Sequence, residues 1–521
     1  MSRTLALSRT LALSRTGAVI TAPVRDEASP DERIRRGLRQ LREELALPRE
    51  FPDEVLAAAE LAAHAGGLAG DAAAGRRRRD LTGIDFVTID PPGSTDLDQA
   101  VHIERRGQGF RVRYAIADVA AFVGVGGPLD DECRARGVTI YLPDGRIPLH
   151  PPVLSEHAAS LRAGEDRPAL VWQLDLDADG SVDEVVLERA VVRSRAELDY
   201  PSLQRSLDDG DPATRPEVAT LLAEVGRLRQ DRAAERGAVS LPLPDQEVVI
   251  GADGHIGLTF RAPLPVEDWN AQISLMTGMA AARIMVDDGV GVLRTLPPPD
   301  GHTVAELRAD AAALGVDWGP EDSYADVIRS LDPAFPDQAA FATQAARLLR
   351  GSGYAAFDRR AGIAPPEGSD AEHSALAAPY AHVTAPLRRL VDRFANEVVL
   401  ACCAGAEVAD DVRAALAVLP ELMASARRRE SQADSGARDL VEQVILSGHV
   451  GQPLDAVVVG VDRHGLRLQV RDPAVLGRVD TATAASFHLG QEVVVTADDA
   501  GSLELSAPPS DRHADGREVE A

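Results

Sequence analysis

Three aspartates, Asp90, Asp96 and Asp98, lie close together in the sequence. An alternating β-rich run brings Asp90 to the end of a predicted strand, a Pro/Gly turn follows, and two more acids arrive six and eight residues later. Such oxygen-rich clusters suit hard cations such as Mg²⁺, because a cation relieves the repulsion between neighbouring carboxylates. Turns are also rich in Asp, Pro, Gly and Ser for conformational reasons alone. The residue types by themselves leave both interpretations open.

A second acidic stretch, Asp175-Leu-Asp177-Ala-Asp179-Gly180, opens like a calcium-binding EF-hand loop. The twelfth position, which requires a bidentate Glu, is Val186, and both flanks are typical of strands. We predict a hairpin turn here and no calcium site.

The elements that must position the acids change in character along the chain. Further strands are predicted at 100–104 and 110–116, before a long region that mixes β and α. That region has one hairpin at 246–261, turning at Asp253-Gly254, and helices at 215–236, 265–288, 304–314, 338–350, 386–404 and 410–433. Five short strands then return at 455–460, 466–470, 477–480, 492–497 and 503–506, as in an OB barrel.

Bulk composition is that of a globular protein, with 45% apolar and 26% charged residues among 521, and no apolar run of membrane-spanning length. The net charge of −27 argues against a polyanionic partner, yet all 55 basic residues are Arg, which binds phosphate bidentately. Cys133, Cys402 and Cys403 are expected to be reduced core residues, and zinc is not expected.

The N-terminus repeats the hexapeptide Ser-Arg-Thr-Leu-Ala-Leu at 2–7 and 8–13. A transit peptide has a similar composition, but a tandem duplication or a misassigned start codon explains the repeat more simply. We predict a disordered tail over 1–30, followed over 31–80 by a helical region and an Arg-rich linker.

The residues from Asp80 to Ala100 closely resemble the catalytic opening of the ribonuclease II/R (RNB) family, which has four aspartates at this spacing. Three further blocks follow in the family's order. They are Tyr141 to Glu156 running on to Pro168, Val266-Glu267-Asp268 at the start of an Ala-rich helix, and Tyr380-Ala-His382-Val-Thr384-Ala-Pro386-Leu-Arg388-Arg389. Four ordered matches over about 310 residues make coincidence improbable.

The resemblance implies a role for each matching residue. Asp90, Asp96, Asp98 and Gln99 would surround Mg²⁺, with Mn²⁺ as a possible substitute, and Asp96, Asp98 and Arg388 would be catalytic. Thr384 and Pro386 are typical of a helix start, which would place amide donors beside Arg388. RNA would contact Tyr141, Glu267 or Asp268, and Arg389. His382 is expected to order its loop from outside the site.

Three departures from the family pattern stand out. Gln99 replaces the fourth aspartate and should weaken or shift metal coordination, because a neutral carbonyl oxygen replaces a charge. No strand-rich pair of cold-shock barrels precedes the catalytic block, so we expect a short form with looser processivity and strong salt dependence. Ala385 stands where the family has Ser, which removes one capping hydroxyl.

The fold class expected is α+β. A short helical N-terminal region would precede an RNB catalytic domain at 81–440, built as a mixed β-sheet surrounded by helices. An OB-type RNA-binding barrel at 449–507 and an acidic tail at 508–521 would follow.

The function expected is a cytoplasmic, monomeric, Mg²⁺-dependent 3′-to-5′ exoribonuclease that degrades single-stranded RNA to nucleoside 5′-monophosphates. No membrane contact and no stable protein partner are expected. The alternatives are an RNA-binding protein that keeps the channel without hydrolysis, with Gln99 as the motive, and a nuclease acting on DNA.

Overall fold

A six-stranded mixed sheet forms the centre of the larger domain. The computed structural model describes residues 29–67, 77–209, 215–241, 245–250, 256–332, 335–462 and 465–506. The strand order is β1-β8-β2-β3-β4-β7, and β8 also pairs with β7, so the long strand β8 closes the sheet on itself. Strands β1 and β2 run parallel to β8, and the other pairs are antiparallel. The strands are β1 (Arg79–Asp80), β2 (Phe86–Asp90), β3 (Gln99–Arg106), β4 (Gly109–Ala117), β7 (Asp166–Leu176) and β8 (Val182–Asp199).

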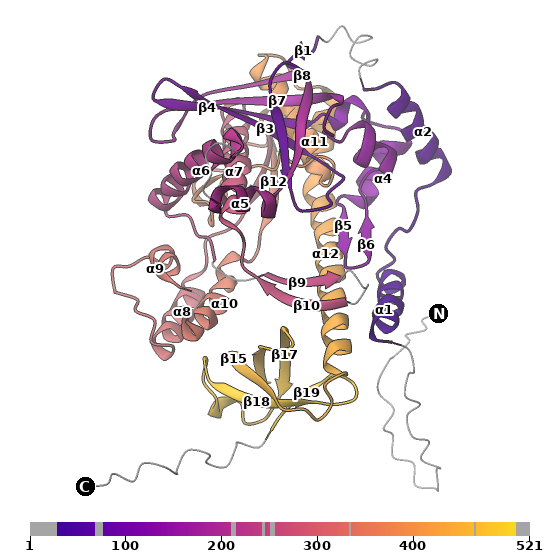
Figure 1. The fold of residues 1–521 in the computed structure, drawn as a ribbon. Coiled ribbons are helices and arrows are strands. Elements are labelled where there is room, and N and C mark those ends of the chain that lie inside the picture. Colours follow the sequence, from indigo (N-terminus) through magenta and orange to yellow (C-terminus); the bar gives the residue numbers. More distant parts are fainter. Residues whose placement is uncertain are drawn as a thin grey trace, which may run out of the picture.

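Helices cover this sheet and bury its apolar side chains. Helix α7 (Pro265–Asp288) begins with a proline, whose missing N–H costs nothing at a helix start, and ends at Gly289 with φ of +84°. Figure 1 shows α5, α6 and α7 together beneath the strands. The other helices of this domain are α4 (Pro128–Arg136), α5 (Tyr200–Asp208), α6 (Glu217–Arg236), α8 (Gly301–Ala313), α9 (Tyr324–Ser330), α10 (Pro336–Ala345) and α11 (Leu390–Cys403).

Short two-stranded sheets lie outside the six-stranded sheet. They are β5 (Ile140–Leu142) with β6 (Gly145–Ile147), β9 (Asp245–Ile250) with β10 (Ile256–Arg261), β11 (Val290–Thr295) with β12 (Gly353–Asp358), and β13 (Glu372–His373) with β14 (Ala378–Pro379). The β9–β10 pair is the predicted hairpin, although its turn at 253–254 lies outside the described residues.

Helix α12 (Asp410–Leu446) carries the chain from the larger domain to the C-terminal barrel (Figure 1). Its 37 residues span about 55 Å at 1.5 Å per residue. Helix α1 (Pro30–Glu44) packs beside it through two glycines: a Cβ at Gly37 would lie 2.5 Å from Leu440, and one at Gly436 would lie 2.8 Å from Leu41. Helix α2 (Asp53–His64) completes the N-terminal region.

The barrel has five antiparallel strands in the order β17-β16-β15-β18-β19. They are β15 (Leu454–Asp462), β16 (Gly465–Val470), β17 (Val475–Asp480), β18 (Glu492–Ala497) and β19 (Leu503–Leu505), each overlapping a predicted strand. Together with the helix-covered mixed sheet and the N-terminal helices, this barrel confirms the predicted α+β class.

The buried carboxylate of Glu442 joins three elements. On α12, it accepts hydrogen bonds from Gln246 Nε2 of β9 at 2.7 Å and from the Leu476 amide of β17 at 3.0 Å. Gln246 also donates to the Ala474 carbonyl at 2.8 Å. The hairpin and the barrel are therefore fixed to the same point on the helix.

Some sequence predictions were wrong. The helix expected at 386–404 begins at Leu390, because residues 384–389 form a turn. Cys133 is buried, but Cys402 is half-buried and Cys403 is exposed, so the pair does not belong to the core.

The predicted hairpin after Asp175 is confirmed between β7 and β8. The repeated N-terminus and the acidic tail lie outside the described residues. No described helix is long and apolar enough to cross a membrane.

Candidate active site

Asp98 is the point where two distant parts of the chain meet. Its carboxylate lies just before β3, is buried, and accepts a hydrogen bond from the Leu387 amide at 2.7 Å. The guanidinium of Arg388 lies 3.4 Å from its other oxygen. Burial raises the pKa of Asp98 to about 8, although Arg388 and the Leu387 amide act in the opposite direction. The fold therefore brings together the acid and the arginine that the sequence placed in one site.

Asp90 ends β2, as the sequence predicted, and its side chain is close enough to Asp96 and Arg388 to feel both charges. Burial raises the pKa of Asp90 to about 7, with Arg388 opposing the rise and Asp96 adding to it. One carboxylate oxygen is buried and has no hydrogen-bond partner among the described residues. A buried acid with an unsatisfied oxygen suits a cation, which would supply the missing partner.

Asp96 is held by residues of the β5–β6 hairpin. Tyr141 donates its hydroxyl to Asp96 at 2.8 Å, and the Arg146 guanidinium lies 2.5 Å from the other oxygen. Arg146 also pairs with Glu156 at 2.8 Å and contacts Thr95. Sequence reasoning quoted the block that contains Arg146 but gave it no role. A basic residue five positions after the predicted RNA-contacting tyrosine was the available signal.

A cation fits part of the predicted ligand set. Asp90 offers an unsatisfied oxygen, and both Asp90 and Asp98 hold protons more tightly than ordinary acids. Asp96 is turned toward Arg146 and Tyr141, and within the described part of the chain no three His, Cys, Asp or Glu side chains are gathered as a metal site. Asp90 and Asp98 are thus the two positions best suited to hold a metal.

A hydrogen bond from Gln99 connects the start of β3 to the turn that carries Arg388. Its side-chain amide donates to the Thr384 carbonyl at 2.5 Å. An aspartate at this position would have no proton to donate there. The glutamine therefore has a structural partner of its own, in addition to the metal contact that the sequence suggested.

The turn over 384–389 depends on a buried acid of α11. Asp392 accepts hydrogen bonds from the Ala385 amide at 2.7 Å and from the Arg389 guanidinium at 2.8 and 2.9 Å. No helix start lies at Thr384, which corrects the predicted helix dipole beside Arg388. Arg389 is fixed by Asp392, whereas the Arg388 side chain is 46% exposed and can reach a ligand.

A cavity of about 320 Å³ opens beside Arg388. Its wall includes Tyr141, His382, Glu430 and four arginines, Arg294, Arg388, Arg389 and Arg427. Tyr354 also lines it, with its hydroxyl 2.7 Å from His382 Nδ1. His382 thus supports the wall itself, nearer the site than expected. The lining is locally basic, so the charge of −27 does not extend to this cavity.

Glu267 and Asp268 lie at the start of α7 and do not line this cavity. Glu267 accepts from the Leu264 amide at 2.8 Å and pairs with Arg261 at 2.9 Å, as expected of an acid at a helix start. Burial raises the pKa of Asp268, and the charge of Glu267 adds to the rise. One helical turn further, Asn270 reaches the Ile89 carbonyl at 3.4 Å, next to Asp90.

A family model for the RNB domain matches residues 78–403, well over half of the chain. The chain belongs to the RNB family. A second model, the RNase II-type exonuclease C-terminal S1 domain, matches residues 452–500 of this RNB protein. The five-stranded barrel is therefore an S1 domain, which is the OB-type architecture predicted.

Curated relatives share the catalytic region. Exoribonuclease 2 of Klebsiella pneumoniae (strain 342) is 27% identical over 454 residues, covering 83% of this chain and 66% of the relative. Exosome complex exonuclease RRP44 homolog A of Arabidopsis thaliana is 30% identical over 339 residues, covering 62% and 35%. The RNB protein thus spans about two thirds of the length of the first relative and a third of the second.

Solved structures share the fold. Mycoplasma genitalium RNase R in complex with ribose-methylated single-stranded RNA matches with a TM-score of 0.77 at 18% identity, covering 91% of this chain and 78% of that one. Yeast Ssd1, described as a pseudonuclease, matches with a TM-score of 0.62 at 16% identity, covering 77% and 50%. The same architecture is therefore found in a ribonuclease and in a pseudonuclease.

Proposed function

We propose that this RNB protein is a 3′-to-5′ exoribonuclease that hydrolyses single-stranded RNA to nucleoside 5′-monophosphates with Mg²⁺. The observation that carries the proposal is the contact of buried Asp98 with the Leu387 amide and Arg388 at the edge of a basic cavity. The family membership and the exoribonuclease relatives support the exoribonuclease activity, and the direction and products are what the family resemblance implies. Cytoplasmic location and a monomeric state remain predictions.

Each residue of the site has a distinct task in this proposal. Arg388, exposed at the cavity, binds a non-bridging oxygen of the scissile phosphate and balances charge as the bond to the 3′ oxygen breaks. Tyr141, on the cavity wall, supports the terminal nucleotide with its ring. Asp90 and Asp98 would hold the metal, and Gln99 would offer its carbonyl oxygen. When bound, Mg²⁺ supplies Lewis-acid charge and a more acidic water.

The pair formed by Asp96 and Arg146 fixes the Asp96 carboxylate before substrate binds. Tyr141 and Arg146 both hold this carboxylate, so one hairpin positions Asp96 and the proposed nucleotide contact Tyr141 together. Such preorganisation reduces the entropy lost when substrate binds.

The test uses purified full-length protein with 5′-end-labelled single-stranded RNA and Mg²⁺. We expect a ladder that shortens from the 3′ end, and an Asp98→Asn variant about a thousandfold slower, since several kcal/mol of transition-state stabilisation disappear. Asp434→Asn is the matched control, because it removes an exposed acid paired with Arg438 on α12. Intact RNA in the wild-type reaction would contradict the proposal.

A second candidate is an RNA-binding protein without hydrolysis. It is favoured by the Gln99 amide bonded to Thr384 and by the Asp96 carboxylate occupied by Arg146. In that case the same reaction leaves the RNA intact while a retarded band appears in a mobility-shift gel. Parallel reactions with DNA of the same sequence test whether the ribose hydroxyl is required.

A further inference from the structure

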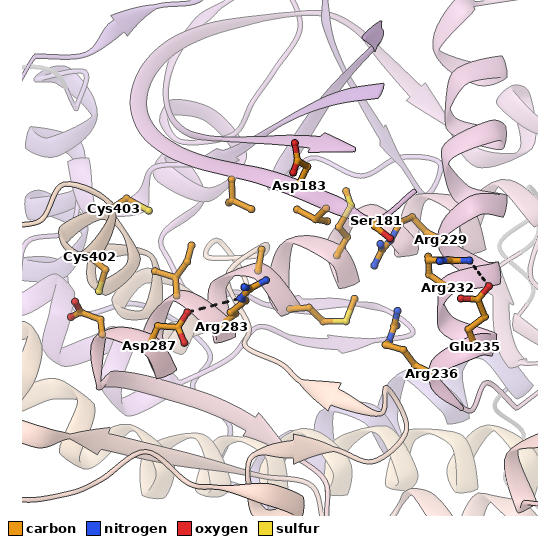
Figure 2. A pocket seen from close by; sticks show the side chains of 17 residues that line it. Ser181, Asp183, Arg229, Arg232, Glu235, Arg236, Arg283, Asp287, Cys402 and Cys403 are labelled. Atoms are coloured by element: carbon orange, nitrogen blue, oxygen red, sulfur yellow. Dashed lines mark hydrogen bonds and ion pairs between the residues drawn. The ribbon is translucent and has the colours of Figure 1, made fainter. Parts of the chain in front are cut away.

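A second cavity, of about 1040 Å³, lies against the C-terminal half of α7. Helix α6, the beginning of β8 and the end of α11 complete its wall, and Figure 2 shows the side chains that line it. None of these residues lines the cavity beside Arg388. The two cavities are therefore separate sites on the same domain.

One end of this cavity is made of arginines from a single helix face. Arg229, Arg232 and Arg236 follow each other on α6 at spacings of three and four residues, which places them on one side of the helix. Figure 2 shows these three guanidinium groups together at one end of the cavity. Like charges this close repel each other, so the arrangement costs free energy unless an anion offsets it.

Arg229 is the most informative of the three. It is 5% exposed, donates to the Gly180 carbonyl at 2.7 Å, and keeps a buried Nε with no hydrogen-bond partner among the described residues. Burial, together with the charges of Arg236 and Arg232, lowers the pKa of Arg229 to about 10, with Asp179 acting in the opposite direction. Burying a charged guanidinium with an unsatisfied donor is costly. An anion bound in the cavity would offset part of this cost through its charge.

The neighbouring arginines differ in their partners. Arg232 pairs with Asp179 at 3.0 Å and also with Glu235. Arg236 has a long contact of 3.4 Å to the Leu376 carbonyl, and burial lowers its pKa. Among the described residues, no salt bridge joins Arg229 or Arg236 to a carboxylate. Arg229 and Arg236 therefore line the cavity without a carboxylate in direct contact, although the charge of Asp179 acts on Arg229.

The rest of the wall restricts the ligand further. Met276, Met279 and Ile284 of α7 add apolar side chains to the wall. Figure 2 shows Asp287 at the other end of the cavity from Arg229, Arg232 and Arg236, beside Arg283 at 3.9 Å. A second anionic group would be repelled by Asp287 and Asp288, although Arg283 offsets part of the charge of Asp287 at 3.9 Å. The best match has one phosphate, a flat apolar body for the methionines, and amino or hydroxyl donors at its far end.

We propose that this cavity is a binding site for a nucleoside 5′-monophosphate, with the phosphate on Arg229 and Arg236, the base against Met276 and Met279, and its polar edge toward Asp287. Binding here does not require hydrolysis of RNA. This proposal can therefore be tested separately from the proposed catalytic function.

Methionine methyl groups provide the test, because the sequence has five methionines. Met276 and Met279 line this cavity, while Met423 lines the cavity beside Arg388. In full-length protein with ¹³C-methyl methionine, we expect AMP to shift the Met276 and Met279 signals in a saturable way. Adenosine, which lacks the phosphate, should need at least a tenfold higher concentration. Met279→Leu and Met423→Leu assign the signals.

Variants separate the phosphate contact from general effects. Arg236→Gln should weaken the AMP-dependent shift of Met279 at least tenfold, and Arg229→Lys provides a second variant that keeps the charge but loses the fork of donors. Arg105 is an exposed arginine of β3 that pairs with Glu224 of α6 and does not line the cavity, so Arg105→Gln is the charge-matched control and should bind like wild type. Shifts confined to Met423, or equal AMP affinity in Arg236→Gln, would overturn the proposal.

Discussion

Arginines are used in opposite ways in two parts of the RNB domain. At the candidate active site, Arg389 is held by Asp392 at 2.8 Å and Arg146 by Asp96 at 2.5 Å. In the cavity between α6 and α7, Arg229 and Arg236 have carbonyl partners and no carboxylate among the described residues. A paired guanidinium fixes the position of neighbouring groups, whereas an unpaired one remains available to an anion. The presence of an internal counter-charge therefore distinguishes a positioning arginine from a receptor for ligand.

The region in which arginines are paired with carboxylates should lose more stability on substitution than the region in which they are not. Asp392 is completely buried, and Asp392→Asn leaves the Arg389 charge uncompensated and weakens its bonds to the turn before α11. We expect the free energy of unfolding in urea to fall by about 3–5 kcal/mol. Asp434→Asn, in an exposed ion pair of α12, should change it little. An unchanged unfolding midpoint in Asp392→Asn would mean that the pair does not hold the turn.

A histidine behind the active-site turn should make stability depend on pH. His150 lies between Cys133, 3.1 Å from its Nδ1, and the Pro386 carbonyl, 3.1 Å from its Nε2. Burial, with the charges of Arg393 and Arg136, lowers its pKa from 6.5 to about 3, although the Pro386 carbonyl acts in the opposite direction. The unfolded chain therefore takes up a proton below pH 6.5 that the folded chain does not. Stability is lost as pH falls, by at most about 1.4 kcal/mol per pH unit.

Substituting this histidine isolates its share of the acid sensitivity. In His150→Gln we expect a shallower decline of the unfolding free energy between pH 6 and pH 4, measured by urea titration at each pH. His302→Gln is the control, because that side chain is 82% exposed. Parallel slopes in wild type and His150→Gln would show that the buried imidazole does not carry the effect.

Substituting Gln99 tests whether this residue serves the structure, the metal or both. Gln99→Asp adds a charged ligand beside Asp98 but removes the hydrogen bond to Thr384, at a cost of about 1 kcal/mol. We expect the Mg²⁺ concentration for half-maximal hydrolysis to fall several-fold while thermal stability decreases. Gln99→Leu, which loses the donor and adds no charge, controls for the loss of the bond. An unchanged Mg²⁺ requirement would place residue 99 outside the metal's reach.

The smallest change in the free energy of unfolding is expected among the α6 arginines that have no carboxylate partner. It should have the opposite sign to the change in Asp392→Asn. Arg236→Gln removes one of three like charges on a face of α6. Without ligand we expect the free energy of unfolding to stay the same or rise by about 0.2–0.5 kcal/mol, because repulsion between neighbours on the helix decreases. A clear loss of stability would show that Arg236 has a structural partner like that of Arg389.

The sequence predicted the elements with strong local signals. Helix α7 has the predicted bounds because Pro265 and Gly289 mark its ends, and the barrel strands follow their alternating pattern. The start of α11 was misplaced because the 384–389 turn depends on Asp392 and on Asp98, far away in sequence. Local propensity does not contain such contacts.

The candidate site was only partly predictable. Asp98 and Arg388 could be placed together through their motifs, but the pairing of Asp96 with Arg146 depends on where the β5–β6 hairpin packs. The arginines of α6 gave no signal, because their spacing is also that of a solvated helix face. What sets them apart is the burial of Arg229 and the cavity that all three line, which are properties of the folded chain.

Glu442 has a consequence for movement of the S1 barrel. Since one carboxylate satisfies donors from the hairpin and from the barrel, neither can swing away without leaving a desolvated acid unmatched. Hydrogen bonds weaken steeply with distance, so a small displacement of the barrel already loses much of its bond to Glu442. We therefore expect the barrel to be either docked on α12 or released from it, with few stable positions between.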